Sequence, residues 1–235
     1  MIEEYDPSAF PPFAVTVDIA VLTIRRGRLH VLLIQRGVEP FAGMWALPGG
    51  FVTPDESAHE AAQRELAEEA FVGNDIHLEQ LATYSEPGRD PRMRVVSVAH
   101  VALAPNLPEP KAGSDATRAR WYPTDEVSDL AFDHDVILAD ALRRVRSKLE
   151  YTTLATSFLS PAFTIGELRA VYSAVWGAEV PAANFRRKVL ATPGFVTPVA
   201  DFRAGVPGPK AQLYMAGDAG EIVPAFNRNA MTRAQ

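Results

Sequence analysis

One 23-residue segment, Gly50 to Val72, constrains the fold of this chain more than any other part of its sequence. It opens on a glycine turn, and Ser57 followed by Glu60 forms the S-x-x-E pattern of a capping box, which predicts the start of a helix. Alanines and a leucine then favour helix through Glu69. The segment therefore predicts a loop followed by a short helix.

Carboxylates are concentrated on this predicted helix. Glu65, Glu68 and Glu69 stand at i, i+3 and i+4, so they project from one face, and Arg64 can pair with Glu68 one turn on. Three like charges so close repel one another, and a hard cation such as Mg²⁺, bound through carboxylates and waters, relieves that repulsion. The alternative is an acidic helix face exposed to solvent.

The spacing of these residues is similar to a known motif. Gly50, five residues, Glu56, seven residues and then Arg64-Glu65-Leu66-x-Glu68-Glu69 resemble the Nudix box, and Trp45-x-Leu47-Pro48-Gly49-Gly50 resembles the segment that precedes it. The resemblance implies an α/β fold, the Nudix α/β/α sandwich with a mixed sheet.

In the Nudix family the residues that match this box have assigned roles. The resemblance implies that Glu65, Glu68 and Glu69 bind Mg²⁺, helped by Glu56 and the Gly50 backbone. It also implies that the first three are the catalytic residues if the chain is an active hydrolase, in which the metal neutralises a diphosphate and activates water.

The box departs from the family pattern at its end. The family has glycine two residues after the last glutamate, where this chain has Phe71. If that position requires a left-handed backbone, a non-glycine residue costs about 1–2 kcal/mol, and Gly73 could end the helix instead. The sequence therefore predicts that ligand binding is retained and leaves hydrolysis open.

A loop before the predicted strand at Val95 is rich in arginine. Arg89, Arg92 and Arg94, held between prolines and a glycine, could grip a diphosphate, although a rigid surface loop is the alternative. The run R-D-P-R-x-R-V-x-S, with Gln35-Arg36-Gly37 upstream, resembles the Nudix subgroup that acts on ADP-ribose. The resemblance implies ADP-ribose or a related NAD metabolite as the ligand, with four residues in its site: Arg36, Arg89, Arg92 and Gly50.

Composition narrows the setting of the chain. It has no cysteine, no apolar run long enough to span a bilayer and an acidic rather than basic start, which predicts a cytoplasmic protein without a membrane partner. Residues 1–150 hold 15 Lys and Arg against 24 Asp and Glu, whereas residues 151–235 hold 8 against 5. A basic rear half is typical of a module with a polyanionic partner.

Period-two apolar patterns predict the strands of a front domain over residues 1–149, closed by a helix from His134 to Lys148. The strands are expected at residues 13–24, 29–35, 76–84, 95–103 and 119–123.

Residues 150–225 have the order of a winged helix-turn-helix domain: a helix from Leu149 to Leu159, a helix opened by a second capping box at Thr164, a third, basic helix, and a hairpin. The third helix would enter the major groove. The residues expected to contact DNA are Asn184, Arg186, Arg187 and Lys188 on that helix, with Arg203 and Lys210 on the wing. A helical dimerisation domain with a solvated basic face is the alternative, and residues 226–235 are expected to be disordered.

The combination of the two domains resembles the Nudix-related transcriptional regulators of the NrtR family. The resemblance implies a homodimeric repressor of NAD biosynthesis or salvage genes that binds a palindromic double-stranded operator and releases it when ADP-ribose binds. The alternative function is a Mg²⁺-dependent ADP-ribose pyrophosphatase whose rear domain serves dimerisation.

Overall fold

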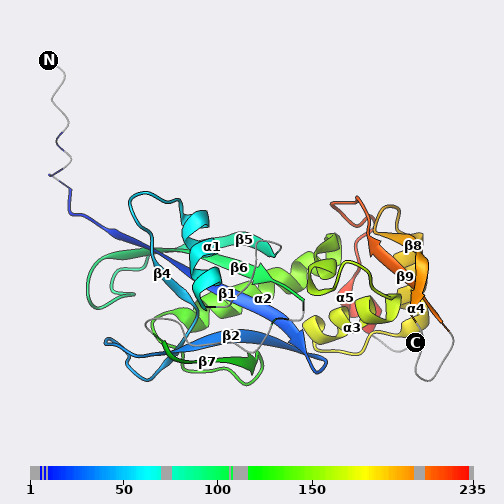
Figure 1. Cartoon of the computed structure of the whole chain (residues 1–235), viewed down its shortest axis with the longest axis horizontal. Helices are drawn as coiled ribbons and strands as arrows, with labels where there is room; N and C mark the ends of the chain where they lie inside the picture. Colours follow the sequence, from blue (N-terminus) through cyan, green and yellow to red (C-terminus); the bar gives the residue numbers. More distant parts are fainter. Residues whose placement is uncertain are drawn as a thin grey trace, which may run out of the picture.

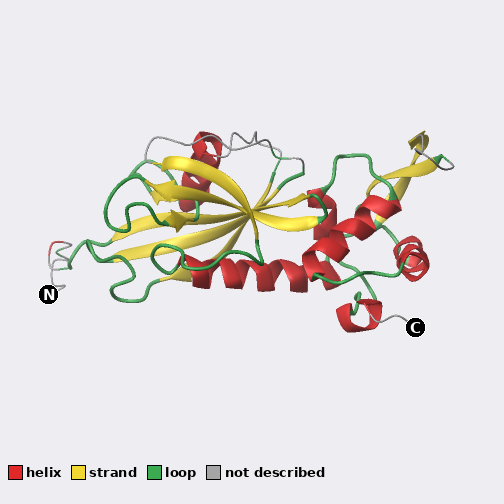
Figure 2. Cartoon of the chain, turned by 90° about the horizontal axis from the view of Figure 1, so that it is seen from below, coloured by secondary structure: helices red, strands yellow, loops and turns green. Residues whose placement is uncertain are grey.

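The computed structural model describes residues 6, 8, 10–69, 76–105, 107, 116–203 and 210–232. These residues form a front domain built on a sheet and a smaller rear domain of helices and a hairpin (Figure 1). One long helix, α2 (His134–Tyr151), runs beneath the sheet and ends inside the rear domain (Figure 2). No helix in the described part of the chain is long and apolar enough to cross a membrane.

The sheet of the front domain has seven strands and is mixed. β1 runs parallel to β6, and every other pairing is antiparallel. The strand β6 has the predicted bounds, the other predicted strands have ends shifted by one to three residues, and the two short strands β3 and β4 were not expected. The strands are β1 (Ala14–Arg25), β2 (Arg28–Arg36), β3 (Trp45–Ala46), β4 (Gly49–Phe51), β5 (His77–Tyr84), β6 (Val95–Leu103) and β7 (Ala116–Pro123).

The central strand β1 divides one of its edges between two partners. Residues 16–18 pair with β4 and residues 22–25 pair with β2, while β6 follows the other edge from Ala14 to Leu22. Since β2 and β4 separate along this edge, the sheet opens between them. The residues of the candidate ligand site lie around this opening, as described below.

Two helices cover opposite faces of the sheet (Figure 2). Side chains alternate along β1: Val17, Ile19 and Val21 pack with α1 (Ala58–Glu69), whereas Ala20 and Leu22 belong to the core that includes α2. This period-two alternation places apolar side chains on both faces of the strand. The predicted α/β/α sandwich with a mixed sheet is confirmed.

The rear domain has the predicted order of elements, with one correction. The expected helix from Leu149 to Leu159 is divided: α2 ends at Tyr151, and a 3₁₀ helix, η2 (Thr153–Phe158), follows. The Thr152 side chain explains the break, because its hydroxyl bonds to the Lys148 carbonyl and accepts the N–H of Leu154. The other elements are α3 (Ile165–Trp176), α4 (Ala182–Ala191), β8 (Val196–Arg203) and β9 (Ala211–Ala216), which forms a hairpin with β8.

Local signals set the ends of α3. Thr164 and Glu167 make both hydrogen bonds of the predicted capping box, and Gly177 ends the helix with a φ of +66°. Pro181 stands at the N-cap of the next helix. The apolar cores of the two domains form one continuous cluster, which runs from β1 through α2 to α3 and α4.

The described part of the C-terminal tail is ordered, which corrects the expectation of disorder over residues 226–235. Residues 228–232 form the short helix α5 (Arg228–Thr232), and Phe226 and Met231 are buried. The Phe226 N–H donates to the Glu150 carbonyl at 2.6 Å, and the Ile222 N–H donates to the Tyr151 carbonyl at 2.8 Å. The tail is held because it covers the rear core, which its polar sequence alone does not reveal.

Candidate ligand site and DNA-binding surface

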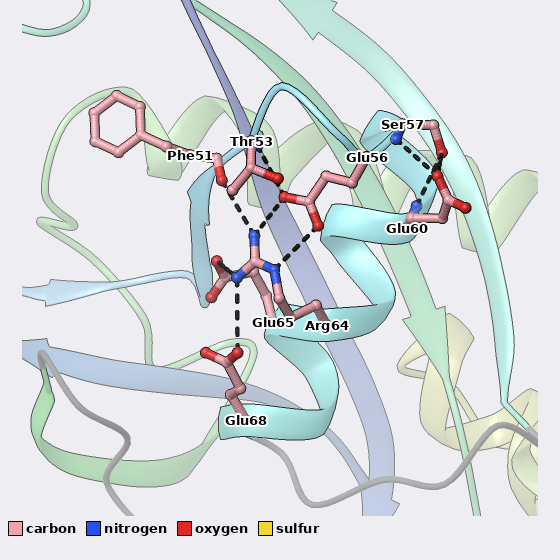
Figure 3. A network of polar contacts seen from close by, with 8 residues as sticks. All are labelled: Phe51, Thr53, Glu56, Ser57, Glu60, Arg64, Glu65 and Glu68. Atoms are coloured by element: carbon pink, nitrogen blue, oxygen red, sulfur yellow. Dashed lines mark hydrogen bonds and ion pairs between the residues drawn. The ribbon is translucent and has the colours of Figure 1, made fainter.

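The helix α1 begins where the capping box predicted. The Glu60 N–H donates to the Ser57 hydroxyl at 3.2 Å, and the Ser57 N–H donates to the Glu60 carboxylate at 2.8 Å (Figure 3). Ala61, Ala62 and Leu66 are buried against the sheet. Anchoring this face leaves Glu65 and Glu68 turned toward Arg64, as Figure 3 shows.

Three of the predicted metal ligands gather around one arginine (Figure 3). The Arg64 guanidinium lies 2.8 Å from the Glu56 carboxylate, 2.7 Å from that of Glu65 and 3.8 Å from that of Glu68. It also donates to the Phe51 carbonyl at 3.1 Å. The guanidinium thus supplies the positive charge that offsets the repulsion among these carboxylates. In the described part of the chain, no three His, Asp or Glu side chains are arranged so that they could bind a metal ion.

The end of the box lies at the edge of the described structure. Glu69 is the last residue of α1, but its side chain is outside the described part. Phe71 and Gly73, on which the question of helix termination rests, also lie outside the described residues.

Gly50 makes room for Glu65. A Cβ at residue 50 would lie 2.0 Å from the Glu65 carboxylate oxygen Oε1, far inside van der Waals contact. The strand β4 holds this glycine opposite Val17, so the backbone cannot retreat without breaking the pairing with β1. The close approach explains why a glycine is needed at this position of the box.

The charges in this cluster are not equivalent. Hydrogen bonds from Arg64 and from the Thr53 N–H lower the pKa of Glu56 to about 2. Burial raises the pKa of Glu65, even though Arg64 opposes this effect. Glu56 is therefore ionised at neutral pH. A cation placed beside Glu65 would stabilise the ionised form of that side chain against the effect of burial.

A buried polar network forms the floor of the site. The Asp18 carboxylate on β1 accepts hydrogen bonds from the Ser97 hydroxyl at 2.6 Å and from Arg89 at 3.0 Å, and lies 3.3 Å from Nε2 of His134. The Leu47 N–H donates to Nδ1 of His134 at 2.9 Å, which leaves the ring proton on Nε2, facing Asp18. Burial alone would raise the pKa of Asp18, but the contacts with His134, Ser97 and Arg89 hold it well below its usual range.

Arg89, expected to grip a diphosphate, is buried in this network. Its guanidinium makes two hydrogen bonds to Asp133, at 2.6 and 2.9 Å, besides the bond to Asp18, and its side chain is 4% exposed. Both carboxylates offset its charge. Arg89 lines the cavity but also joins β1 to the start of α2.

The cavity above this floor has a volume of about 370 Å³. Its wall is formed by four parts of the front domain: the box helix, the opening between β2 and β4, the arginine loop and the start of α2. The lining residues are therefore far apart in the sequence, the first being Thr16 and the last His134. Gly50, Arg36, Arg89 and Arg92, the four predicted ligand residues, all line it. Phe41 and Trp45, two aromatic residues shortly before the box that could stack on an adenine, do not line it.

Besides Phe51, the cavity wall contains a second phenylalanine, Phe132, which sequence reasoning missed. The guanidinium of Arg36 lies 4.7 Å from its ring centroid and that of Arg92 lies 6.0 Å away. Phe132 has a φ of +57°, a left-handed conformation that is costly for a bulky side chain and that is often found at ligand sites. The local sequence carries no signal for this role, because the arginines come from distant parts of the chain.

Arg92 also pairs with Asp90, at 2.7 Å. The sequence assigns no catalytic base, and Glu86 and Asp90 are the candidates in the arginine loop. Burial opposes ionisation of Asp90, but the bonds from Arg92 lower its pKa. Asp90 therefore serves first to orient Arg92 at the cavity wall.

The basic helix of the rear domain is α4. Phe185 and Val189 are buried on its inner side, and Arg186 and Arg187 are exposed on its outer side. Asn184 is half-buried and accepts a hydrogen bond from Arg187 at 2.9 Å.

The other predicted DNA contacts lie near this helix or on the wing. The Lys188 ammonium lies 5.5 Å from the centroid of the Phe226 ring, so the ordered tail supports it. Lys210 is exposed before β9, and Arg203 ends β8 with its side chain outside the described part. The loop between them, residues 204–209, lies outside the described residues.

A sandwich that carries this box, followed by three helices and a hairpin, defines a class of protein: a Nudix domain joined to a winged helix. The NUDIX domain family matches residues 12–145, and the NrtR DNA-binding winged helix domain family matches residues 155–216. The "ADPR responsive transcriptional repressor NtrR" of Acinetobacter baylyi is 34% identical over 193 residues, which are 80% of this chain and 77% of that protein. The chain belongs to the NrtR family of Nudix-related transcriptional regulators.

Solved structures agree with this assignment. Shewanella oneidensis NrtR complexed with a 27mer DNA superposes with a TM-score of 0.77 at 30% identity, covering 91% of this chain and 99% of that one. The NUDIX domain of the same protein complexed with ADP ribose superposes with a TM-score of 0.55 at 36% identity, covering 60% and 94%. An ADP-ribose pyrophosphatase of Methanocaldococcus jannaschii is 42% identical over 113 residues, 48% of this chain and 66% of that protein.

Proposed function

We propose that this protein is a transcriptional repressor of NAD biosynthesis or salvage genes that senses ADP-ribose, or a related NAD metabolite, through its Nudix domain. The observation that carries the proposal is the arginine-walled cavity of about 370 Å³, in a chain whose rear domain belongs to a DNA-binding family. The Acinetobacter relative is described as responsive to ADPR, and the Shewanella domain was crystallised with ADP ribose. A repressor acts where its operator lies, so we place the chain in the cytoplasm.

Within the cavity, Arg36 and Arg92 are the residues we assign to the diphosphate of the ligand. Both guanidinia lie beside the Phe132 ring, and planar guanidinium groups recognise phosphate oxygens through paired hydrogen bonds. Arg89 lines the same cavity, and its bonds to Asp18 and Asp133 favour a role in positioning the wall as well as in binding. Gly50 contributes by leaving room for Glu65.

Nudix domains typically use divalent metal ions, and the carboxylate oxygens of the box are ligands of the type that Mg²⁺ prefers. Carboxylate oxygens of Glu56, Glu65 and Glu68 surround the Arg64 guanidinium. The same oxygens would stabilise a metal cation at this position. We propose these three residues and Glu69 as the metal ligands. Mg²⁺ bound there would offset the charge of a diphosphate. Arg64 would then keep its hydrogen bond to the Phe51 carbonyl, and its ion pairs with the carboxylates would be replaced by bonds from the carboxylates to the metal.

For DNA, we propose that α4 enters the major groove. Arg186 and Arg187 are its exposed cations, and Asn184 and Lys188 flank them. Arg203 and Lys210, at the two ends of the wing, would contact the phosphate backbone. A homodimer of this chain would bind a palindromic operator, because two-fold symmetry in the protein requires it in the DNA.

A second function is favoured by the same acidic cluster. If Mg²⁺ binds, Glu65, Glu68 and Glu69 are the catalytic residues of an ADP-ribose pyrophosphatase, the activity named for the Methanocaldococcus relative. Hydrolysis would be compatible with repression, since a slow enzyme would remove its own signal. Mg²⁺-dependent turnover that Glu69→Gln abolishes would establish the activity. Turnover that survives this change would mean either a contaminating enzyme or a different arrangement of the metal ligands.

The proposal is tested by fluorescence anisotropy of the full chain on duplex DNA from upstream of NAD-synthesis genes, titrated with ADP-ribose at fixed salt. We expect selective binding that ADP-ribose releases. Arg187→Ala should weaken DNA binding and spare ligand affinity, whereas Arg92→Ala should weaken the response to ADP-ribose and spare DNA affinity. Arg143→Ala, on the exposed side of α2, is the matched charge control and should change neither.

Two results would contradict the proposal. Binding that is equal on unrelated duplexes would mean that the rear domain does not read sequence. Release by ADP-ribose that is unchanged in Arg92→Ala would place the ligand outside this cavity. Reciprocal coupling adds a check, because DNA must weaken ADP-ribose binding by the same factor by which ADP-ribose weakens DNA binding.

A further inference from the structure

A second cavity, of about 540 Å³, lies at the seam between the two domains. Figure 1 shows the β1–β2 turn of the front domain beside α3 of the rear domain, and residues of both line this cavity. It is separate from the first cavity, since the two share no lining residue. Neither the Nudix box nor the basic helix α4 contributes to it.

Two arginines from different helices line this seam. Arg146, on α2, donates through Nε to the Val175 carbonyl at 3.1 Å, and Arg169, on α3, donates through Nη1 to the Val180 carbonyl at 2.9 Å. Among the described residues, no ion pair joins either guanidinium to a carboxylate. Each arginine therefore uses one nitrogen to bind a backbone carbonyl and retains further N–H donors.

Neither carboxylate that lines the cavity forms an ion pair with Arg146 or Arg169 in the described structure. Asp125 lines the cavity but pairs with Arg28 at 2.7 Å, and Glu179 is an exposed lining residue. Burial and, to a smaller extent, the nearby Arg228 lower the pKa of Arg146, the direction expected for a cation that is desolvated and lies near a like charge. A partly buried cation without a counter-charge costs free energy, and a bound anion would recover it.

The lining also limits the kind of anion. Besides the charged groups and Leu29, it consists of small and hydroxyl side chains, among them Gly27, Ala170, Ser173 and Thr124. It contains no aromatic side chain on which a nucleobase could stack. The chemistry favours a compact phosphate compound over a nucleotide, because arginine guanidinia match phosphate oxygens.

We propose that the seam is a binding site for a small non-aromatic phosphate compound, held between Arg146 and Arg169. Residues of the β1–β2 turn, α2 and α3 would all surround the ligand, so its binding would restrain one domain against the other. The site does not depend on ADP-ribose binding in the first cavity.

The test is calorimetric titration of the full chain with inorganic phosphate and, separately, with ribose 5-phosphate, at constant ionic strength and with ADP-ribose saturating the first cavity. We expect saturable binding that Arg146→Gln and Arg169→Gln each weaken about tenfold or more, since each removes a charged donor pair. Arg143→Gln, whose side chain is exposed on α2 and paired with Asp140, should bind as the wild type does. Tighter binding of ribose 5-phosphate would show that the rest of the cavity contributes.

Both glutamine variants remove a bond to a backbone carbonyl, so folding needs its own check. Arg146→Lys and Arg169→Lys retain the charge but lose the planar pair of donors, and they should weaken binding less than the glutamine variants. Crystals soaked in tungstate, a phosphate analogue, would locate the anion directly by its anomalous signal. Affinities that are the same in wild type and in Arg146→Gln, or tungstate found only outside the seam, would overturn the proposal.

Discussion

Phe226 should be essential to the rear domain, although it lies beyond the segment that the winged helix family matches. Its ring is 1% exposed and lies 5.8 Å from Tyr172, 6.3 Å from Phe185 and 5.7 Å from Phe195, measured between ring centroids. Phe185 belongs to the basic helix α4. The tail therefore packs against the inner side of the helix that we propose reads DNA.

The magnitude of its effect follows from burial. A buried phenylalanine removes about 150–250 Å² from water, and at about 25 cal/mol per Å² this corresponds to about 4–6 kcal/mol. Measured Phe→Ala substitutions in cores cost about 3–5 kcal/mol. Since whole domains are stable by about 5–15 kcal/mol, Phe226→Ala should leave the rear domain partly unfolded at ordinary temperature.

The assay is hydrogen exchange of α3 and α4 followed by mass spectrometry, paired with DNA anisotropy. In Phe226→Ala we expect these helices to lose most of their protection, while the front sheet retains it. DNA binding should fall with the protection of α4. Val223→Ala, in the same segment but 72% exposed, is the control and should behave as the wild type.

The reasoning would be refuted by a small effect. If Phe226→Ala lowers the stability of α3 and α4 by less than about 1 kcal/mol, the tail does not contribute to the rear core as its burial indicates. Equal losses in the front sheet would instead mean that the two domains unfold as one unit.

Three further perturbations have defined outcomes. Thr164→Ala removes the capping box of α3 and should cost about 1 kcal/mol of rear-domain stability, measured by urea unfolding. Arg89→Ala leaves Asp18 buried without its cation and should cost about 3–5 kcal/mol of front-domain stability, measured in the same way. The pKa of Glu56 is lowered from 4.5 to about 2, mainly by Arg64. Its stabilising contribution is therefore fully present above pH 4.5 and is lost as the pH falls toward 2. In Glu56→Gln, the free energy of unfolding should depend less on pH between these two values.

Each of these expectations has a contrary result. Unchanged urea midpoints would refute the first two. An acid transition that keeps its shape in Glu56→Gln would assign the loss of stability to other carboxylates. Thr156, which is in a 3₁₀ helix and caps no α-helix, offers a matched threonine-to-alanine control for Thr164.

The sequence alone was sufficient for the elements whose signals are local. The box helix α1 begins at its capping box, α3 begins at Thr164 and ends at Gly177, and β6 has the bounds that its alternating pattern predicts. Capping bonds and side-chain periodicity involve residues within one or two turns of one another, so they can be read from a short segment. The multi-residue spacing of the box also identified the family before any tertiary contact was known.

Tertiary structure alone decided which residues share a site. Asp18, Arg89 and His134 come from β1, a loop and α2, and they meet only because the sheet brings these elements together. The same holds for the ordered tail, which is stabilised by a core made of other segments, and for the seam between Arg146 and Arg169. Burial and pairing depend on neighbours far along the chain, so a polar or aromatic residue has no local pattern that reveals its partner.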